Sequence, residues 1–224
     1  RNDTLQFDLN PSISSIPREQ WDRCPHAPPF LSHAWLRCLE ESMCVSSATG
    51  WIPQHLAIRI GGSLAGFVPL YVKGNSFGEF IFDQAWADAA YQNQIQYYPK
   101  LLSGSPFTPV TGNRILWLPE TLSNFTGTDL SRFRRSVGKF LMKLAATNKL
   151  SGVHINFLTD TEATDIAGLL PDNNKYISRS KSMESLLKTV QSVKDDFVRR
   201  TSLQYHWHNQ NTRNRNLPYT SFDE

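Results

Sequence analysis

The sequence predicts an α/β fold in which a mixed, mostly antiparallel sheet is flanked by helices. Three observations support this prediction. Apolar runs on both sides of Gly61-Gly62-Ser63 describe a hairpin, because Gly-Gly supplies the positive φ angles of a tight turn. Apolar residues recur at helical spacing within 29–43 and again within 130–150. The length of 224 residues suits one domain, since domains commonly run about 100 to 200 residues.

The first helix is expected at 29–43, with Ser32 as its N-cap. Its periodic apolar residues are Phe30, Ala34, Trp35, Leu36, Leu39 and Met43. The two hairpin strands follow within 55–72, and a short helix is expected at 85–94. These elements already alternate between helix and strand, as the predicted fold requires.

Two further strands are expected at 97–102 and 114–118. The loop between them is rich in proline, which fixes its backbone, and we expect that loop to line a cleft. A second long helix is expected at 130–150, capped by Thr128 or Asp129.

One face of this second helix is basic, because cations recur on it at steps of three and four residues. The cations are Arg132, Arg135, Lys139 and Lys143. Such a stripe attracts phosphates in some proteins, but more often it is a solvated surface. After it, Val153, Ile155 and Phe157 alternate as in a strand, and Thr159 and Glu162 have the spacing of a capping box for a helix that Pro171 ends.

The last part of the chain is less regular. Residues 178–200 are expected to be an inserted helix or a linker, and 202–209 to be a half-buried strand with His206 and His208 on its polar face. We expect 12–224 to form a single domain.

Composition narrows the class of protein. A formal net charge of +3 is mild, so it does not indicate a DNA-binding protein. The three cysteines lack the spacing of a zinc site, and their odd number favours a reducing compartment. No apolar run reaches the roughly 18 residues that a membrane span needs, and the first ten residues lack the apolar core of a secretory signal. We therefore expect a soluble intracellular protein, either cytoplasmic or organellar. An organellar protein would have lost a leader sequence, which the start at Arg1 allows.

The segment 71–116 has the composition of a binding site. Aromatic side chains and prolines there shape a surface, and charged residues lie between them. Burying those charges beside aromatic rings would be costly unless they pair or meet a ligand. A set of aromatic strands with a solvated charged face would give the same composition.

The sequence contains several uncommon phrases, which include PFLSH at 29–33, TGWIPQHL at 49–56, GEFIFDQAWA at 78–87, YYPKL at 97–101, PFTPVTG at 106–112 and QYHWHN at 204–209. With these phrases together, the chain resembles the FemAB-like family over 12–118 densely and 150–224 thinly. The resemblance implies an acyl-CoA N-acyltransferase (GNAT) fold. It also implies a second GNAT-like half, which we expect to be absent from this chain.

The family resemblance further implies transfer of an acyl or aminoacyl group to an amine, with acyl-CoA or aminoacyl-tRNA as donor and a small-molecule or peptide amine as acceptor. Such transfer needs a base, an oxyanion-stabilising group and a pocket that excludes water. The expected catalytic residues are Glu79, Asp83 and His206. The residues expected to bind substrate are Tyr71, Lys73, Trp86, Tyr98, Lys100, Phe107, Thr108, Arg114 and Trp207.

Three alternatives stay open. The chain could be a carbohydrate- or peptide-binding module that uses its aromatic side chains as stacking platforms. The chain could be a non-catalytic relative that serves as an accessory or scaffold subunit of a larger protein assembly, with the aromatic surface buried against a partner. A histidine on the polar face of a strand is also more often a hydrogen-bonded structural residue than a catalytic one, which applies to His206. No metal ligand set is predicted. His33, His55 and His154 are expected to be structural.

Overall fold

The computed structural model describes residues 3–167 and residue 197. The chain divides into two units, residues 1–174 and 175–224, and every element described here belongs to the first unit. The predicted insertion at 178–200, the helix end at Pro171 and the strand at 202–209 lie outside the described residues, apart from the single residue 197. The prediction of one domain over 12–224 stays a prediction.

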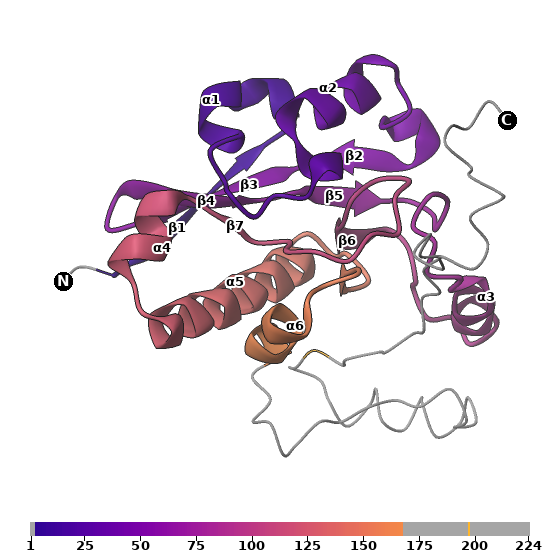
Figure 1. Ribbon diagram of the computed structural model, residues 1–224. Coiled ribbons are helices and arrows are strands. Elements are labelled where there is room, and N and C mark those ends of the chain that lie inside the picture. Colours follow the sequence, from indigo (N-terminus) through magenta and orange to yellow (C-terminus); the bar gives the residue numbers. More distant parts are fainter. Residues whose placement is uncertain (1–2, 168–196, 198–224) are drawn as a thin grey trace, which may run out of the picture. The chain divides into compact units, whose positions relative to one another are not determined.

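The described residues form a mixed α/β structure, as the sequence predicted (Figure 1). The strands are β1 (Leu5–Asn10), β2 (Trp51–Pro53), β3 (His55–Ile60), β4 (Ser63–Val68), β5 (Leu70–Lys73), β6 (Lys100–Ser103), β7 (Leu116–Trp117) and β8 (Val153–Ile155). The α-helices are α1 (Arg18–Trp21), α2 (His33–Glu41), α3 (Gln84–Gln92), α4 (Pro119–Asn124), α5 (Gly127–Thr147) and α6 (Asp160–Ala167). Short 3-10 helices occupy Ile13–Ser15, Pro29–Leu31 and Ser47–Thr49.

The predicted hairpin is present, but its strands belong to two sheets instead of one. One sheet has the order β1-β3-β4-β7 and the other β2-β5-β6-β8. The register is unchanged from the pair Trp51↔Lys73 to the pair Ile58↔Gly66, so β2-β3 and β4-β5 are the two arms of a single long hairpin. All the strand pairs are antiparallel except β6 with β8, which makes the structure mixed and mostly antiparallel, as predicted.

The two sheets separate along the outer edge of this hairpin, where β6 pairs with β5 and β7 pairs with β4. Ser103 pairs with Leu70, and Leu116 pairs with Phe67, so twelve residues lie between the two pairs on one chain segment and only two on the other. The extra residues form a loop, 104–115, which is the proline-rich loop expected from the sequence. It leaves the sheet beside the ends of β6 and β8.

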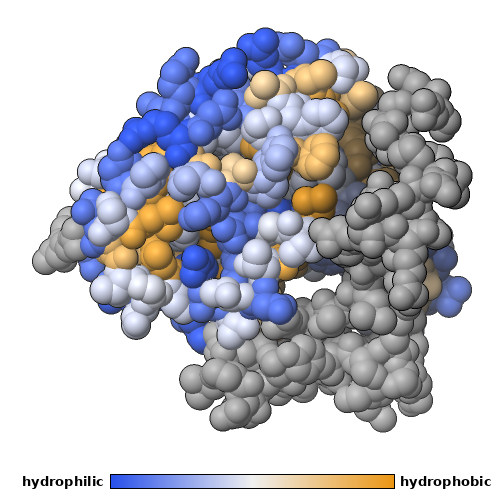
Figure 2. Space-filling model, in the orientation of Figure 1, coloured by the Kyte–Doolittle hydropathy of each residue, from blue (hydrophilic) through white to orange (hydrophobic). Residues whose placement is uncertain are grey.

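Helices lie on both faces of the sheet (Figure 1). Helices α1 and α2 pack on one face, in a core that contains Trp21, Leu36 and Phe67. Helix α5 lies on the other face, where Phe140 stacks on Phe7 of β1 with 4.1 Å between ring centroids. The outer surface drawn in Figure 2 is hydrophilic over much of its area, with separate hydrophobic areas between. The structure is therefore layered as helices, sheet, helices.

Local signals predicted the start of one long helix correctly and that of the other wrongly. Ser32 caps α2, as predicted, by accepting a hydrogen bond from the backbone N–H of Trp35. The predicted cap of α5 was wrong, because Thr126 caps this helix and Asp129 completes the capping box from inside it. Thr126, Thr128 and Asp129 are all residue types that cap helices, so the sequence alone did not identify which of them is the cap.

The strand predicted at 114–118 is shorter because of Glu162. Its carboxylate accepts hydrogen bonds of 2.7 Å from the backbone N–H groups of Arg114 and Ile115, which therefore do not join a ladder. Only half of the predicted capping box forms at α6: Thr159 accepts from the backbone N–H of Glu162, but the Glu162 side chain turns away from Thr159. Phe157 does not continue β8, since its φ of 56° is left-handed.

Candidate active site

Two lysines lie directly opposite each other on neighbouring strands. Lys73 ends β5 and pairs in register with Lys100, which begins β6. Both side chains are fully buried. Like charges opposite each other on a sheet repel, and burial makes the repulsion stronger. The fold therefore requires anionic partners at this point, and Glu79 and Asp83 supply them.

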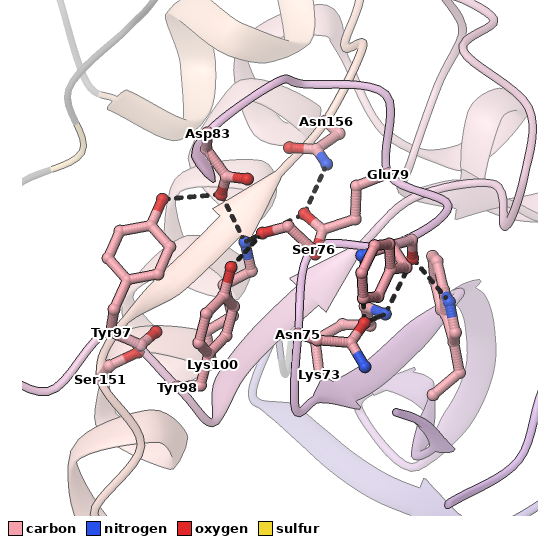
Figure 3. A network of polar contacts seen from close by, with 12 residues as sticks. Lys73, Asn75, Ser76, Glu79, Asp83, Tyr97, Tyr98, Lys100, Ser151 and Asn156 are labelled. Carbon is pink, nitrogen blue, oxygen red and sulfur yellow. Dashed lines mark hydrogen bonds and ion pairs between the residues drawn. The ribbon is translucent and has the colours of Figure 1, made fainter. Parts of the chain in front are cut away.

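The ammonium of Lys100 lies between the two carboxylates (Figure 3). Its Nζ is 2.8 Å from Oδ2 of Asp83 and 3.1 Å from Oε2 of Glu79. The ring centroids of Tyr97 and Tyr98 are 5.2 and 5.3 Å away. Because the carboxylates are at most 3% exposed, this is a buried ion-pair network rather than a surface one.

Hydroxyl groups complete the network around Lys100 and Asp83. The Tyr97 hydroxyl donates to Oδ2 of Asp83 at 2.7 Å, and Lys100 also donates to the Ser76 hydroxyl at 3.3 Å. The hydroxyls of Ser76 and Tyr98 hydrogen-bond to each other. The network thus joins β6 to the connection between β5 and α3.

Lys73 has a separate set of partners next to this network. Its Nζ donates to the side chain of Asn75 at 3.2 Å and to the carbonyl oxygen of Phe77 at 3.1 Å. It also lies 4.0 Å from the ring centroid of Trp51. Burial lowers the pKa of Lys73 to about 8, although the negative charge of Glu79 opposes the shift. Near neutral pH this amine can therefore exchange its proton much more readily than a surface lysine.

The two carboxylates have different proton affinities. Burial raises the pKa of Glu79 despite the contact with Lys100. Burial also acts to raise the pKa of Asp83, but hydrogen bonds from Lys100 and Tyr97 outweigh it and leave the pKa below its ordinary value. The pair thus resembles the acid-base arrangement of many enzymes, in which different environments separate the pKa values of two carboxyl groups. Glu79 is the group suited to take up a proton.

Each carboxylate keeps one oxygen unused. Oε1 of Glu79 and Oδ1 of Asp83 are buried, and neither has a hydrogen-bond partner among the residues that the structure describes. Asp83 also occupies the N-cap position of α3 without capping it, because its side chain turns to Lys100. An aspartate at that position normally caps the helix. Departures of this kind from a local rule are expected at functional sites.

Strained backbone surrounds the cluster. Phe80, Phe82 and Phe107 have φ angles of 57°, 51° and 58°, in the left-handed region that bulky side chains rarely adopt. Gly78 has a φ of 78°, and a Cβ there would lie 2.6 Å from the ring of Phe107. Strain of this kind persists only where surrounding contacts impose it, commonly at functional sites.

The predicted substrate-binding residues divide into three groups. Lys73, Tyr98 and Lys100 lie in the cluster with Glu79 and Asp83 (Figure 3). Tyr71, Arg114, Phe107 and Thr108 have their own contacts elsewhere, and Trp86 touches the cluster through its backbone N–H, which donates to the carbonyl oxygen of Asp83 at 3.0 Å. His206 and Trp207 lie outside the described residues.

Each residue of the second group has a position of its own. Tyr71 packs between Trp51 and His55 in the core. Trp86 lies on α3. Thr108 makes local hydrogen bonds in the 104–115 loop, where Phe107 packs against Trp51.

Arg114 supports the site from outside. Its fully buried guanidinium donates to the backbone carbonyl oxygens of Asn156, Val110 and Asn113, and burial lowers its pKa to about 10. The side-chain amide of Asn156 in turn lies 3.4 Å from Oε2 of Glu79, as a donor. Arg114 therefore holds the loop that carries a neighbour of Glu79.

Sequence reasoning did not single out several members of this region, among them Ser76, Tyr97, Asn156 and Glu162. Tyr97 stands beside a predicted site residue in the YYPKL phrase, so its sequence position gave a signal. Asn156 and Glu162 are far from the other members in sequence, and only the parallel pairing of β6 with β8 brings their segment to the site.

The fold and the buried cluster define an α/β protein with a lysine–carboxylate site where two inner strands of a mixed sheet, β5 and β6, end and begin. The chain belongs to the FemAB-like family, described as peptidoglycan biosynthesis/recognition, whose model matches residues 12–223. No curated protein and no solved structure matches the chain. None of the described helices combines the length and the apolar character needed to cross a lipid bilayer. All three cysteines are free thiols.

Proposed function

We propose that this protein transfers an acyl or aminoacyl group from an activated donor to an amine acceptor, with Glu79 as the general base. Membership of the FemAB-like family supports the reaction class. The observation that supports the role of Glu79 is its buried Oε1, which has no hydrogen-bond partner in the part of the chain that the structure describes, in a carboxyl group whose pKa burial raises. A base with a raised pKa and a free lone pair suits proton removal near neutral pH.

In this reaction the amine nitrogen attacks the donor carbonyl carbon and a new C–N bond forms. Glu79 takes the proton that the nitrogen loses. The bond from the carbonyl carbon to the donor's leaving oxygen or sulfur then breaks, and Lys73, with a pKa of about 8, returns a proton to that leaving group. Asp83 stays ionised and holds Lys100, whose positive charge limits the cost of ionising Glu79.

Acyl-CoA and aminoacyl-tRNA are the two donor classes to test, and a small-molecule or peptide amine is the acceptor class. The assay incubates the purified protein with radiolabelled acetyl-CoA or with tRNA charged with radiolabelled amino acids, plus lysine-containing peptides. It measures label in the peptide. Transfer by the wild type is expected to fall at least about hundredfold in Glu79→Gln, the lower range for loss of a general base.

Glu19→Gln is the matched control, since Glu19 is an exposed glutamate in the first turn of α1. It should transfer at the wild-type rate. Equal transfer by Glu79→Gln and Glu19→Gln would refute the role of Glu79. Absence of transfer by the wild type from both donor classes would refute the enzyme proposal and favour the accessory-subunit alternative.

A further inference from the structure

A histidine borders the acidic pair of the buried cluster. One carboxylate oxygen of Glu79, one of Asp83 and one ring nitrogen of His154 all lie within 4.8 Å of one another. The two acids are buried and His154 is half-buried. Carboxylate oxygen and imidazole nitrogen are both ligands that zinc accepts, and three protein ligands leave a fourth position open on a tetrahedral ion.

The sheet register explains why His154 reaches this place. His154 pairs with Leu102 in the parallel ladder of β6 and β8, and Leu102 is two residues from Lys100. Residues two apart on a strand share a face, as do paired residues on neighbouring strands. The His154 side chain therefore lies on the face where Lys100 meets Asp83, and its ring is 6.0 Å from that of Tyr97.

Lys100 does not use all of the acidic oxygens. Its Nζ contacts Oε2 of Glu79 and Oδ2 of Asp83, whereas Oε1 and Oδ1 are buried without a hydrogen-bond partner among the described residues. An unpaired oxygen of a buried carboxylate costs free energy. A cation bound between the two carboxylates and His154 would give a partner to a carboxylate oxygen that has none among the described residues.

We propose that Glu79, Asp83 and His154 form a binding site for a divalent transition-metal ion, for which zinc is the probe. The imidazole ligand favours zinc over magnesium or calcium, which prefer oxygen ligands. Zinc binds such ligands at about 2.0–2.2 Å, so the three ligand atoms, which lie within 4.8 Å of one another, must move closer together around the ion. The charge of Lys100 weakens binding, because it repels a second cation.

This site shares Glu79 with the proposed transfer reaction. A lone pair that coordinates a metal ion cannot also accept a proton, so zinc and catalysis by Glu79 exclude each other. Zinc is therefore expected to inhibit transfer, and a chelator to restore it. The inference concerns metal binding itself, which is measured whether or not transfer occurs.

The test is calorimetric titration of the full chain with zinc chloride after removal of metals by a chelator. One ion per chain is expected to bind through the cluster, with affinity at least about tenfold lower in His154→Gln, the lower range for disturbing a metal site. The matched control is His26→Gln, because His26 is an exposed loop histidine, and its affinity should equal that of the wild type. Circular dichroism shows whether each variant is folded.

Absence of zinc binding by the wild type, or equal binding by His154→Gln and the wild type, would overturn the metal site. Lys100→Met gives a second measurement, since loss of the repelling charge should strengthen zinc binding. Zinc should therefore raise the melting temperature of Lys100→Met more than it raises that of the wild type. A smaller rise in Lys100→Met than in the wild type contradicts the site. Zinc binding without transfer would refute the proposed function alone, and transfer without zinc binding would refute this inference alone.

Discussion

Replacing Lys100 by methionine tests the balance of charges at the centre of the protein. Lys100 is fully buried and its ammonium lies 2.8 and 3.1 Å from two carboxylates that are almost fully buried themselves. Methionine fills a similar volume but leaves Glu79 and Asp83 without their cation. Removing one partner of a buried ion pair costs about 3–5 kcal/mol. For a chain of this length that lowers the melting temperature on the order of 10 °C.

The loss should depend on pH in a defined direction. Without Lys100, burial raises the folded-state pKa of Glu79 and Asp83 above their unfolded values. Groups shifted in that direction stabilise the fold below the unfolded pKa, and the stability is lost as pH rises through the folded pKa. The gap between Lys100→Met and the wild type should therefore be widest at about pH 7 and shrink towards about pH 4.

Equilibrium unfolding in urea, followed by tryptophan fluorescence at both pH values, measures this gap. Lys139→Met is the matched control, since Lys139 is exposed on α5 and its replacement should change stability by less than about 0.5 kcal/mol. A Lys100→Met loss below about 1 kcal/mol, or one that is the same at both pH values, would refute the reasoning from a buried charge network.

Two further predictions concern the support of the site and of the core. Gly78→Ala places a Cβ 2.6 Å from the ring of Phe107 at a φ of 78°, and should lower the free energy of unfolding in urea by about 1–3 kcal/mol. Gly127→Ala is the control, because nothing lies within 4 Å of its Cβ, and it should not lower that free energy. Burial acts to raise the pKa of Glu40, but hydrogen bonds, above all from His55, outweigh burial and lower this pKa below 4.5. The ionised Glu40 therefore stabilises the fold at neutral pH, and this stabilisation is lost as pH falls through the folded-state pKa. Glu40→Gln should therefore lose less stability than the wild type between about pH 6 and pH 3, and an unchanged acid slope would contradict this.

The helix around 33–41 and the hairpin at Gly61-Gly62 could be predicted because their signals are local. A serine before an amphipathic run caps a helix, and two glycines between apolar runs make a tight turn. The predictions were less accurate where a distant side chain competes with the local rule. Glu162 takes the N–H groups of Arg114 and Ile115, and this ends a strand that the apolar pattern predicted to be longer.

Part of the candidate site could also be predicted from the sequence. Glu79 and Asp83 stood out because carboxylates among aromatic residues need a partner if they are buried, and that requirement follows from composition alone. Sequence could not show which cation each would meet, nor that Asn156 would lie beside Glu79. Those neighbours come from different strands, and their proximity depends on strand pairing.

The sequence by itself determined the hairpin, the long helices and the kinds of side chain in the buried cluster, because periodicity, caps and turns act over a few residues. Only the tertiary structure decided that Lys73 and Lys100 would face each other and that His154 would come to the acidic pair. The reason is that register between strands is set by the packing of the whole sheet. A shift of one residue in β6 would turn Lys100 to the other face and leave both carboxylates without their cation.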